Sequence, residues 1–598
     1  MLAPFAGTVV AIARASDDQV SAGDVLVVLE AMKMEHEIPA GVDGIVHSID
    51  VGVGDAVDTG QVLAAVTPGS SPEDRSREDA STAETSSDDL DAVNARHAQT
   101  LDAARPEAVA KRHDQSRRTA RENLDDLIDP GSFVEFGPLI FAAQEARRPR
   151  EELQRRTPAD GLVAGTATID GAPAIVMSYD YTVLAGTQGM RNHLKKDRLF
   201  EIAERRRLPA VLFTEGGGGR PGDVDVPHVA GLDVRAFHLF ARLSGLVPLV
   251  GIASGYCFAG NAALLGCCDV VIATEDSSIG MGGPAMIEGG GLGVFEPIEV
   301  GPIDVQDAAG VVDLRVADEA AAVNAAKRYL SYFTQTVREP EAPSDPNALR
   351  HLIPSNRKRA YDVRAVIDTL LGDVLELRRG FGAGIVTALA RGENGRPLGV
   401  IANNPNHLGG AIDSDGADKA ARFMQLCDAF GLPILFLCDT PGFMVGPNAE
   451  KTGTVRHFSR MFLTGANLSV PTGTIVLRKG YGLGAQSMAA GGFKAPLFVV
   501  AWPTGEFGGM GLEGAVRLGL RRELDAIDDP NERERAYNAA VAAAYERGKG
   551  LNMAAYFEID DVIDPADSRR WIATLFDDGQ RNDWRTRETK RRPYVDAW

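Results

Sequence analysis

The segment Glu30–Ile38 reads EAMKMEHEI and places one lysine, Lys33, between two methionines, Met32 and Met34. A lysine that only solubilises a turn explains this pattern poorly, because exposed methionines on a turn cost solubility and gain no packing. The alternative is that an enzyme recognises the tip of the turn and modifies the lysine amine. We therefore interpret Lys33 as a site of enzymatic modification, with Met32 and Met34 as part of the recognised sequence.

Two glycine-rich turns suggest a second kind of chemistry. Each follows an apolar run and precedes a helix of small residues; they read GYCFAGNAALLG from Gly255 and GYGLGAQSMAAGG from Gly480. Glycine and alanine allow close backbone approach, and the start of a helix presents unpaired N–H groups. Two N–H groups aimed at one oxygen form an oxyanion hole. A tight turn with close helix packing would look the same, but the recurrence of the turn favours oxyanion holes.

The composition is that of a large acidic globular protein. The 598 residues are too many for one core and predict several domains. The formal net charge of −21 argues against nucleic acid as a bulk partner, because phosphate binding needs clustered basic side chains. The five cysteines form no C-x-x-C pair, and we interpret them as small buried residues of a reducing compartment. No apolar run reaches the roughly 18 residues of a membrane span. The N-terminus lacks a positive leading segment, so we expect a cytoplasmic protein without a transmembrane segment.

Residues 1–67 contain an internal repeat. GTVVAI from Gly7 aligns with GIVHSI from Gly44, and VSAGDVLVVL from Val20 aligns with VDTGQVLAAV from Val57. Both copies are rich in β-branched residues with glycine or aspartate at the turns, which predicts short strands. Two such copies can bury a core only together, so we expect one small sandwich with Lys33 in the hairpin that joins them. Residues 68–93 are rich in Ser, Asp and Glu, and we predict a flexible acidic linker.

The rest of the chain contains a second, longer repeat. LPAVLFTEGGGG from Leu208 aligns with LPILFLCDTPGF from Leu432, and at the same offset Gly186 aligns with Gly410. Each copy alternates helical patterns with apolar runs that end in glycine turns, which predicts an α/β fold with parallel strands. We place the two halves at residues 94–345 and 346–598. Ligands of such sheets bind at the carboxyl ends of the strands, where both glycine-rich turns fall.

The first 67 residues resemble the biotinyl (biotin carboxyl carrier) domain. Its attachment motif, A-M-K-M, is present as Ala31–Met34 at the centre of the duplicated segment. The resemblance implies an all-β flattened sandwich, biotin as a covalent cofactor on Lys33, and attachment by a biotin protein ligase. Lipoyl domains share this architecture but usually carry D-K-A at the turn, which makes them a distant alternative.

Residues 95–590 resemble the carboxyltransferase subunit of biotin-dependent acyl-CoA carboxylases, which has two crotonase-like halves. The matching words include EGGGGRPGD, RKGYGLGAQSMA and the long word that begins ANNPNHLGGAIDSDG. Carried over by position, the backbone oxyanion holes fall at Ala259 and Gly260 in the first half and at Leu483 and Gly484 in the second. Many relatives carry Gly-Gly in the first hole and Gly-Ala in the second. Because backbone N–H groups do the work, Ala259 and Leu483 can still donate.

The same resemblance suggests residues for substrate binding. Gln486 falls where the family lines its acyl pocket, and its amide leaves the identity of the acyl group open. The word EGGGGRPGD contributes Gly218, Gly219 and Arg220, and Arg220 is expected either to hold a phosphate or to order its loop. His407 and His457 are interpreted as structural. The resemblance implies no metal.

The mechanism implied by the resemblance moves CO2 from carboxybiotin to the α-carbon of an acyl-CoA. One hole stabilises the ureido oxygen of biotin as CO2 leaves, and the other stabilises the enolate oxygen of the thioester. Acyl-CoA is expected at the first-half hole and biotin at the second. Carboxylation of biotin needs ATP, and EGGGGRPGD lacks the G-K-[ST] of a P-loop. We therefore expect a separate biotin carboxylase subunit, and the resemblance implies a homohexamer of this chain.

Three other functions remain open. The same halves could work in a biotin-dependent decarboxylase or transcarboxylase. The chain could be a non-catalytic carrier or scaffold, although intact glycine-rich turns in both halves argue against this. A crotonase-type hydratase or hydrolase would need carboxylates near the holes, for which Glu275 and Glu288 are weak candidates.

Overall fold

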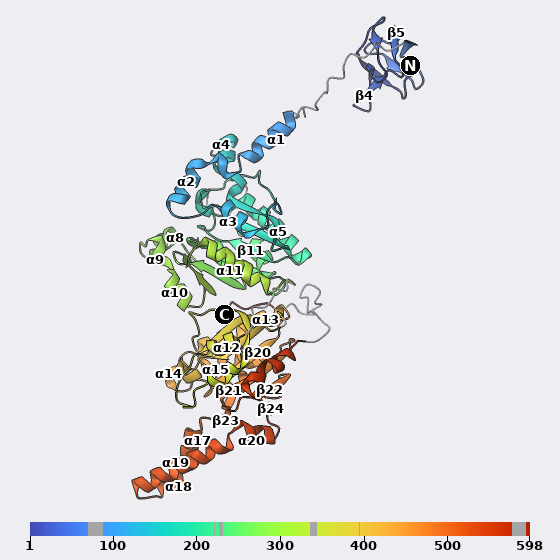
Figure 1. Ribbon diagram of the computed structural model, residues 1–598. Coiled ribbons are helices and arrows are strands. Elements are labelled where there is room, and N and C mark those ends of the chain that lie inside the picture. The colour runs from blue at the N-terminus through green and yellow to red at the C-terminus, as the bar shows by residue number, and fades with distance from the viewer. Residues whose placement is uncertain are drawn as a thin grey trace. The chain divides into compact units, whose positions relative to one another are not determined.

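The structure is a computed structural model that describes residues 1–69, 88–220, 222–225, 231–334, 344–393, 395–576 and 594–597. The chain divides into two compact units, Met1–Asp91 and Ala92–Trp598. Figure 1 traces both units along the chain. Among the described helices, none is both long enough and apolar enough to cross a membrane.

The first unit is a sandwich of two small antiparallel sheets. One sheet has the order β4-β3-β1-β6 and the other β2-β5-β7. A cluster of buried aliphatic side chains, including Val9, Leu26 and Val46, fills the space between them. The flattened β-sandwich predicted from the sequence is confirmed. Its strands are β1 (Gly7–Ile12), β2 (Gln19–Val20), β3 (Val25–Ala31), β4 (Met34–Pro39), β5 (Gly44–Ile49), β6 (Ala56–Val57) and β7 (Ala64–Pro68).

The internal repeat of this unit corresponds to equivalent contacts in the two sheets. A Cβ on Gly7 would lie 2.7 Å from the carbonyl oxygen of Glu30, and a Cβ on Gly44 would lie 2.1 Å from that of Thr67. The repeat that aligns Gly7 with Gly44 also aligns Glu30 with Thr67. Both copies therefore need glycine where two strands approach too closely for a side chain.

The range predicted as a linker, 68–93, is only partly described. Residues 70–87 lie outside the described part of the chain, and helix α1 (Asp88–Ala98) begins inside the predicted linker. Three aspartates, Asp88, Asp89 and Asp91, occupy the first turn of α1. Negative charge at a helix N-terminus interacts favourably with the helix dipole, which explains why this acidic stretch can be helical.

The first half of the second unit is built on a seven-stranded sheet with the order β16-β14-β12-β11-β10-β9-β8. The strands from β10 to β16 are parallel, and β9 is antiparallel to β10. A parallel pair, β13 and β15, lies outside this sheet. The strands are β8 (Val134–Glu135), β9 (Leu162–Ile169), β10 (Ala172–Tyr179), β11 (Ala210–Phe213), β12 (Leu249–Ala253), β13 (Tyr256–Phe258), β14 (Val270–Thr274), β15 (Ser278–Gly280) and β16 (Leu314–Val316).

Some helices of this half connect its parallel strands, whereas α2 and α3 precede the sheet. Helix α3 begins with a complete capping box of Thr119 and Glu122. The helices are α2 (Pro106–Asp114), α3 (Ala120–Leu127), α4 (Arg150–Arg156), α5 (Met190–Arg206), α6 (Ala236–Ala241), α7 (Gly260–Gly266), α8 (Pro284–Gly289), α9 (Pro297–Val300), α10 (Ile303–Ala308) and α11 (Glu319–Ser331).

The second half repeats this sheet almost strand for strand, in the order β17-β18-β19-β20-β21-β22-β24, with β23 paired to β21. Strand β20 occupies the place of β11, and the long strand β21 combines the roles of β12 and β13. The crotonase-like α/β duplication expected from the longer repeat is confirmed. The strands are β17 (Gly372–Leu377), β18 (Ile385–Arg391), β19 (Pro397–Asn403), β20 (Ile434–Thr440), β21 (Thr472–Tyr481), β22 (Phe498–Ala501), β23 (Glu506–Gly508) and β24 (Asp561–Val562).

The second half differs most from the first after β23. Here α17, α18 and α19 form an arm that extends from the sheet (Figure 1). A buried core that includes Phe240, Phe333 and Phe430 joins the two halves, so they form one compact unit. The helices are α12 (Val363–Leu370), α13 (Ser414–Ala429), α14 (Pro447–Glu450), α15 (Thr454–Ala466), α16 (Gly482–Ser487), α17 (Leu512–Gly519), α18 (Arg521–Asp525), α19 (Pro530–Arg547), α20 (Gly550–Ala555) and α21 (Ser568–Ala573).

Candidate active site

Lys33 lies at the tip of the β3–β4 hairpin. Strand β3 pairs with β4 up to Ala31 and Met34, so Met32 and Lys33 form the two-residue turn. Both turn residues have positive φ, 53° and 66°, as a tight hairpin turn requires. The Met32 side chain is 97% exposed and that of Met34 is 64% exposed. The hairpin therefore presents an amine between two exposed thioethers, which suits recognition and modification of Lys33.

In the first half, the candidate hole is formed where a loop meets the start of α7. The loop after β11 contains Gly218 and Gly219, and a Cβ on Gly218 would lie 3.2 Å from the amide nitrogen of Gly260. The backbone N–H groups of Gly219 and Gly260 have no hydrogen-bond partner among the described residues. One donor from a loop and one from a helix N-terminus thus lie together, as an oxyanion hole requires.

Ala259, expected as a donor of the first-half hole, already makes a backbone hydrogen bond. Its N–H donates to the carbonyl of Gly280 at 3.0 Å, as part of the parallel pairing of Phe258 with Gly280. Ala259 is therefore not available to a substrate oxygen in this arrangement. Its backbone angles, φ 51° and ψ −120°, favour glycine. Ala259 instead turns the chain at the start of α7, where the N–H of Gly260 has no hydrogen-bond partner in the described ranges.

The second half has the equivalent arrangement. A Cβ on Gly484 would lie 2.7 Å from the Cα of Gly442 and 3.1 Å from the amide nitrogen of Phe443. Within the described part of the chain, the N–H groups of Phe443, Leu483 and Gly484 have no hydrogen-bond partner. In the longer repeat, Phe443 and Gly484 are the counterparts of Gly219 and Gly260. The sequence predicted donors at the two helix starts, including Gly260 and Gly484. It named Gly219 only for substrate binding, and it did not single out Phe443.

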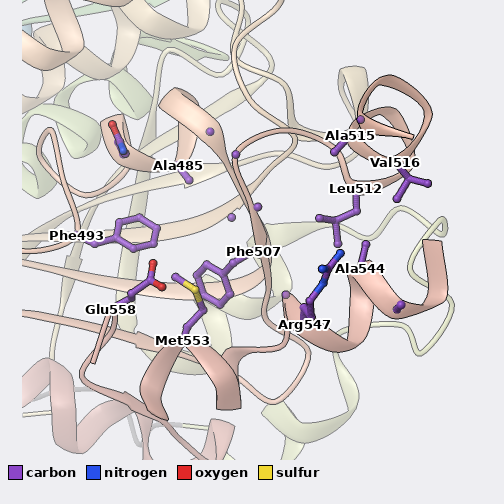
Figure 2. Close-up of a pocket in the computed structure, with 18 of the residues that line it drawn as sticks. Ala485, Phe493, Phe507, Leu512, Ala515, Val516, Ala544, Arg547, Met553 and Glu558 are labelled. Atoms are coloured by element: carbon purple, nitrogen blue, oxygen red, sulfur yellow. The ribbon is translucent and has the colours of Figure 1, made fainter. Parts of the chain in front are cut away.

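A large pocket of about 1150 Å³ opens beside α16 (Figure 2). Its walls come from α16, β23, α17, α19 and α20, so the arm closes one side of it. Most of the lining is apolar, with Ala485 and Phe493 near α16 and Leu512 and Val516 from the arm. Gln486, predicted to line the acyl pocket, is part of this wall. The charged groups in the lining are Lys494, Arg547 and Glu558.

Arg220 orders its loop. Its side chain is only 4% exposed. The guanidinium donates to Asp160 at 2.5 Å and, through Nη2 and Nε, to the carbonyl and hydroxyl of Thr187 at 2.9 and 3.1 Å. These contacts use its donors, so the possibility that it holds a phosphate is not supported. The loop-ordering interpretation accounts for every contact of the residue.

A buried polar group lies behind the first-half hole. The amine of Lys196 donates to the hydroxyl of Tyr179 at 2.8 Å and to Oε1 of Gln188 at 3.0 Å. The Gln188 amide in turn donates to Asn261 at 3.1 Å, next to Gly260. Burial lowers the pKa of Lys196 to about 7, because the charged amine loses its hydration.

The residues weighed for other chemistries lie elsewhere in ordinary structural roles. Glu275 is exposed and pairs with Arg315 at the surface, and Glu288 is exposed on α8. His407 forms a hydrogen bond with Asp413, the N-cap residue of α13, at 3.1 Å. His457 forms one with Asp418, within α13, at 2.7 Å. All five cysteines are free thiols. Four are buried as expected, and Cys267 is half-buried.

Comparison with known families also divides the chain into two parts, and the structural division after Asp91 falls between the two matched ranges. Residues 111–592 match the carboxyl transferase domain family, and residues 1–66 match the biotin-requiring enzyme family. The chain is 35% identical to the methylmalonyl-CoA carboxyltransferase 12S subunit of Propionibacterium freudenreichii, over 78% of this chain and 90% of that one. It is 33% identical to the biotin-dependent long chain acyl-coenzyme A carboxylase beta4 subunit of Mycobacterium tuberculosis, over 77% and 88% of the two chains.

Solved structures agree with these matches. A single-chain, multi-domain long-chain acyl-CoA carboxylase superposes with a TM-score of 0.79 at 56% identity, over 96% of this chain. The present chain spans only 56% of that protein's length. The transcarboxylase 12S structure, described as a hexamer, superposes with a TM-score of 0.70 at 33% identity over 78% of this chain. The chain therefore belongs to the carboxyltransferase family of biotin-dependent acyl-CoA carboxylases, C–C bond-forming enzymes, and it carries a biotin-attachment domain of its own.

Proposed function

We propose that this chain transfers a carboxyl group between biotin attached to Lys33 and the α-carbon of a long-chain acyl-CoA. The observation that carries the substrate class is the apolar pocket of about 1150 Å³ beside α16. Pockets for small ligands usually measure about 300–1000 Å³, so this one has room for more than a short acyl group. Each methylene of the acyl chain that is buried in the pocket contributes about 0.8 kcal/mol to the binding free energy, which favours long acyl chains. The 56% identity to a long-chain acyl-CoA carboxylase supports the same class.

Lys33 suits the attachment of biotin. It is the one lysine within residues 1–66, the range that matches the biotin-requiring family, and it stands exposed at a hairpin tip. No neighbouring acidic side chain within ion-pair distance engages its amine among the described residues. When bound, biotin supplies a ureido nitrogen that carries the carboxyl group. The chain itself contributes the exposed amine and a recognisable turn.

The two holes have separate roles in this proposal. Gly219 and Gly260 donate to the thioester oxygen of the acyl-CoA, where negative charge develops when the α-proton leaves. Phe443 and Gly484, with Leu483 beside them, donate to the ureido oxygen of biotin. A lost donor in such a hole typically costs about 10²–10³ in rate, which is why two matched holes matter. Gln486 and the arm lie beside the second-half hole, and in this proposal they hold the acyl chain because its α-carbon must meet the carboxyl group carried by biotin.

The partners follow from this chemistry. A biotin carboxylase must charge biotin with ATP and bicarbonate, and a biotin protein ligase must attach biotin to Lys33. A homohexamer is proposed because a relative, the transcarboxylase 12S subunit, assembles as one. We expect carboxyl transfer, biotin carboxylation and biotin attachment all to take place in the cytoplasm.

Mass spectrometry tests the attachment. The protein is purified from its own cells, and the peptide that contains Glu30–Ile38 is mapped. A mass increase of one biotinyl amide on Lys33, lost in Lys33→Arg, is expected. An unmodified Lys33 in cells with active biotin ligase would refute the assignment.

A transfer assay tests the substrate class without the partner subunit. Acetyl-, propionyl- and palmitoyl-CoA, each with a labelled carboxyl on the α-carbon, are offered with free biotin as acceptor. We expect the highest kcat/KM with the palmitoyl compound, and we expect Lys33→Arg to retain this activity. A preference for the acetyl or propionyl compound would contradict the long-chain proposal but not the carboxyltransferase.

Transcarboxylation is the second candidate, favoured by the 35% identity to the methylmalonyl-CoA carboxyltransferase 12S subunit. It predicts that the biotinylated protein moves label from one carboxylated acyl-CoA to a second acyl acceptor without ATP or bicarbonate. Dependence of product on a biotin carboxylase would favour the carboxylase instead.

A further inference from the structure

Two buried carboxylates occupy equivalent positions beside the two holes. Glu215 follows strand β11 in the first half, and Asp439 is its counterpart in the second half, at the offset that aligns Gly186 with Gly410. Glu215 is 7% exposed and Asp439 is fully buried. Each carboxylate lies one short loop segment before the loop donor of its own hole, Gly219 or Phe443. Buried carboxylates are costly, so each must be compensated by specific partners.

Asp439 joins the two strands that lead into the second-half hole. It lies on β20, shortly before Phe443, and accepts hydrogen bonds from Nε of Arg478 at 3.1 Å and from the backbone N–H of Lys479 at 3.1 Å. The amine of Lys479 lies 2.8 Å from it. Arg478 and Lys479 lie on β21, shortly before Gly484. The hydroxyl of Tyr361 completes the set at 2.9 Å.

Glu215 is held by residues from outside the repeated sheet. Arg112, on α2, donates to both of its carboxylate oxygens at 3.0 and 2.7 Å. Arg117 lies 4.0 Å away and pairs with Asp276 at 2.5 Å. A second carboxylate, Glu319, lies 3.8 Å from Arg112. The first-half carboxylate is thus fixed by the helix before the sheet, whereas the second is fixed by its neighbouring strand.

The backbone at both carboxylates is equally constrained. A Cβ on Gly186 would lie 2.3 Å from the carbonyl oxygen of Glu215, and a Cβ on Gly410 would lie 2.2 Å from that of Asp439. Both glycines have positive φ, 63° and 91°. Both copies of the longer repeat therefore have the same arrangement. A buried acidic residue lies at the base of the donor loop, and a glycine packs against the backbone carbonyl of that residue.

We propose that Glu215 and Asp439 are matched positioning residues, each of which sets the distance between the two N–H donors of its own hole. Asp439 links the strand that precedes Phe443 to the strand that precedes Gly484. Glu215 fixes the base of the loop that carries Gly219 against α2. Neither carboxylate touches the substrate, and both act through backbone N–H groups. The assignment of one hole to biotin and the other to the acyl group rests on the proposed function.

A purely electrostatic role predicts the opposite sign of effect. A negative charge near a hole opposes an oxyanion, so neutralising Asp439 would speed the reaction if charge alone mattered. Positioning predicts a loss instead, because Arg478 and Lys479 would lose the anion that ties their strand to β20. A displacement of about 1 Å at a donor typically costs about 10²-fold in rate. The sign of the change therefore distinguishes the two roles.

The test uses the full chain and the transfer of a labelled carboxyl from a 2-carboxyacyl-CoA to free biotin. For Asp439→Asn we expect kcat to fall about 10- to 100-fold with a raised KM for biotin, and a KM for the acyl-CoA within about twofold of wild type. For Glu215→Gln we expect a similar fall in kcat, together with a raised KM for the acyl-CoA and a KM for biotin close to that of wild type. The charge-preserving variants Asp439→Glu and Glu215→Asp should recover part of the lost kcat.

A matched control is Asp269→Asn. Asp269 is also buried and accepts a backbone hydrogen bond, from Leu249 at 2.8 Å, but it precedes β14 at the opposite end of the strand from the holes. We expect its kcat to stay close to that of wild type. If Asp439→Asn does not fold, Tyr361→Phe removes one hydrogen bond from the same carboxylate without changing charge, and a fall in kcat of about two- to fivefold is expected.

Wild-type kcat in folded Asp439→Asn and Glu215→Gln, or a rise in kcat, would overturn the proposal. Equal KM changes for both substrates in both variants would also overturn it, because each carboxylate would then not act on its own hole. A wild-type protein that transfers no carboxyl group to biotin would instead refute the proposed function, before any variant is measured.

Discussion

Replacing Gly484 by alanine in the second-half hole should lower the rate of carboxyl transfer and leave the stability of the protein almost unchanged. The new Cβ would lie 2.7 Å from the Cα of Gly442 and 3.1 Å from the amide nitrogen of Phe443. Non-bonded carbons prefer separations of about 3.5–4.0 Å, so the loop or the helix must move by about 1 Å. The atoms that must move are backbone atoms, and Phe443 itself is a proposed donor. Unlike a flexible side chain, this loop cannot yield without changing the hole.

The expected cost follows from that displacement. A donor misplaced by about 1 Å loses about 10² in rate, and a donor lost altogether costs about 10²–10³. Stability should change little, because alanine gains up to about 1 kcal/mol over glycine inside a helix and the overpacking costs about 1–3 kcal/mol. We therefore expect Gly484→Ala to lower kcat at least about 100-fold while it unfolds within a few degrees of wild type.

The assay is carboxyl transfer to free biotin, with thermal unfolding measured on the same samples. Gly266→Ala is the matched control, since Gly266 lies in α7 and a Cβ there would meet no atom within 4 Å. Gly260→Ala should lower kcat by an intermediate factor. Its Cβ would lie 3.2 Å from side-chain atoms of Gln188 and Phe237, and side chains can move more easily than backbone. A Gly484→Ala protein with wild-type kcat would show that this contact does not set the hole, and the reasoning would fail.

Three further predictions concern other parts of the second unit. Arg220→Leu leaves the buried carboxylate of Asp160 unpaired and should lower the free energy of unfolding by about 3–5 kcal/mol in urea titrations; a loss below about 1 kcal/mol would contradict the loop-ordering role. Burial lowers the pKa of Lys196 to about 7, so between about pH 7 and pH 10 its amine is protonated in the unfolded chain but neutral in the folded one, and the free energy of unfolding rises with pH. Lys196→Met should lower the slope of unfolding free energy against pH by up to about 1.4 kcal/mol per pH unit. Identical slopes in the two proteins would refute the prediction. Ala544→Phe should narrow the arm side of the pocket and lower kcat/KM for palmitoyl-CoA compounds more than for propionyl-CoA compounds, whereas an equal loss for both would place the acyl chain elsewhere.

The sequence alone was sufficient for the architecture and for the proposal of an attachment site. Its two internal repeats predicted a duplicated sandwich and a duplicated α/β sheet, because a repeated pattern of apolar runs and glycine turns folds into repeated elements. Contacts at Gly7 and Gly44, and at Gly186 and Gly410, show why those glycines recur. Ala31–Met34 was recognisable because a hairpin turn is local, so its exposure follows from its own residues.

Only the tertiary structure decided which N–H groups are free. Ala259 carries the residue type and position expected of a donor, yet its N–H is taken by Gly280, a partner set by the pairing of β13 with β15. Gly219 and Phe443 become candidate donors because packing brings their loops against Gly260 and Gly484, which lie well beyond them in the sequence. The pocket likewise joins α16 to an arm that follows it in sequence. Local sequence determines which elements form, whereas the occupancy of a backbone hydrogen bond and the wall of a cavity depend on non-local packing.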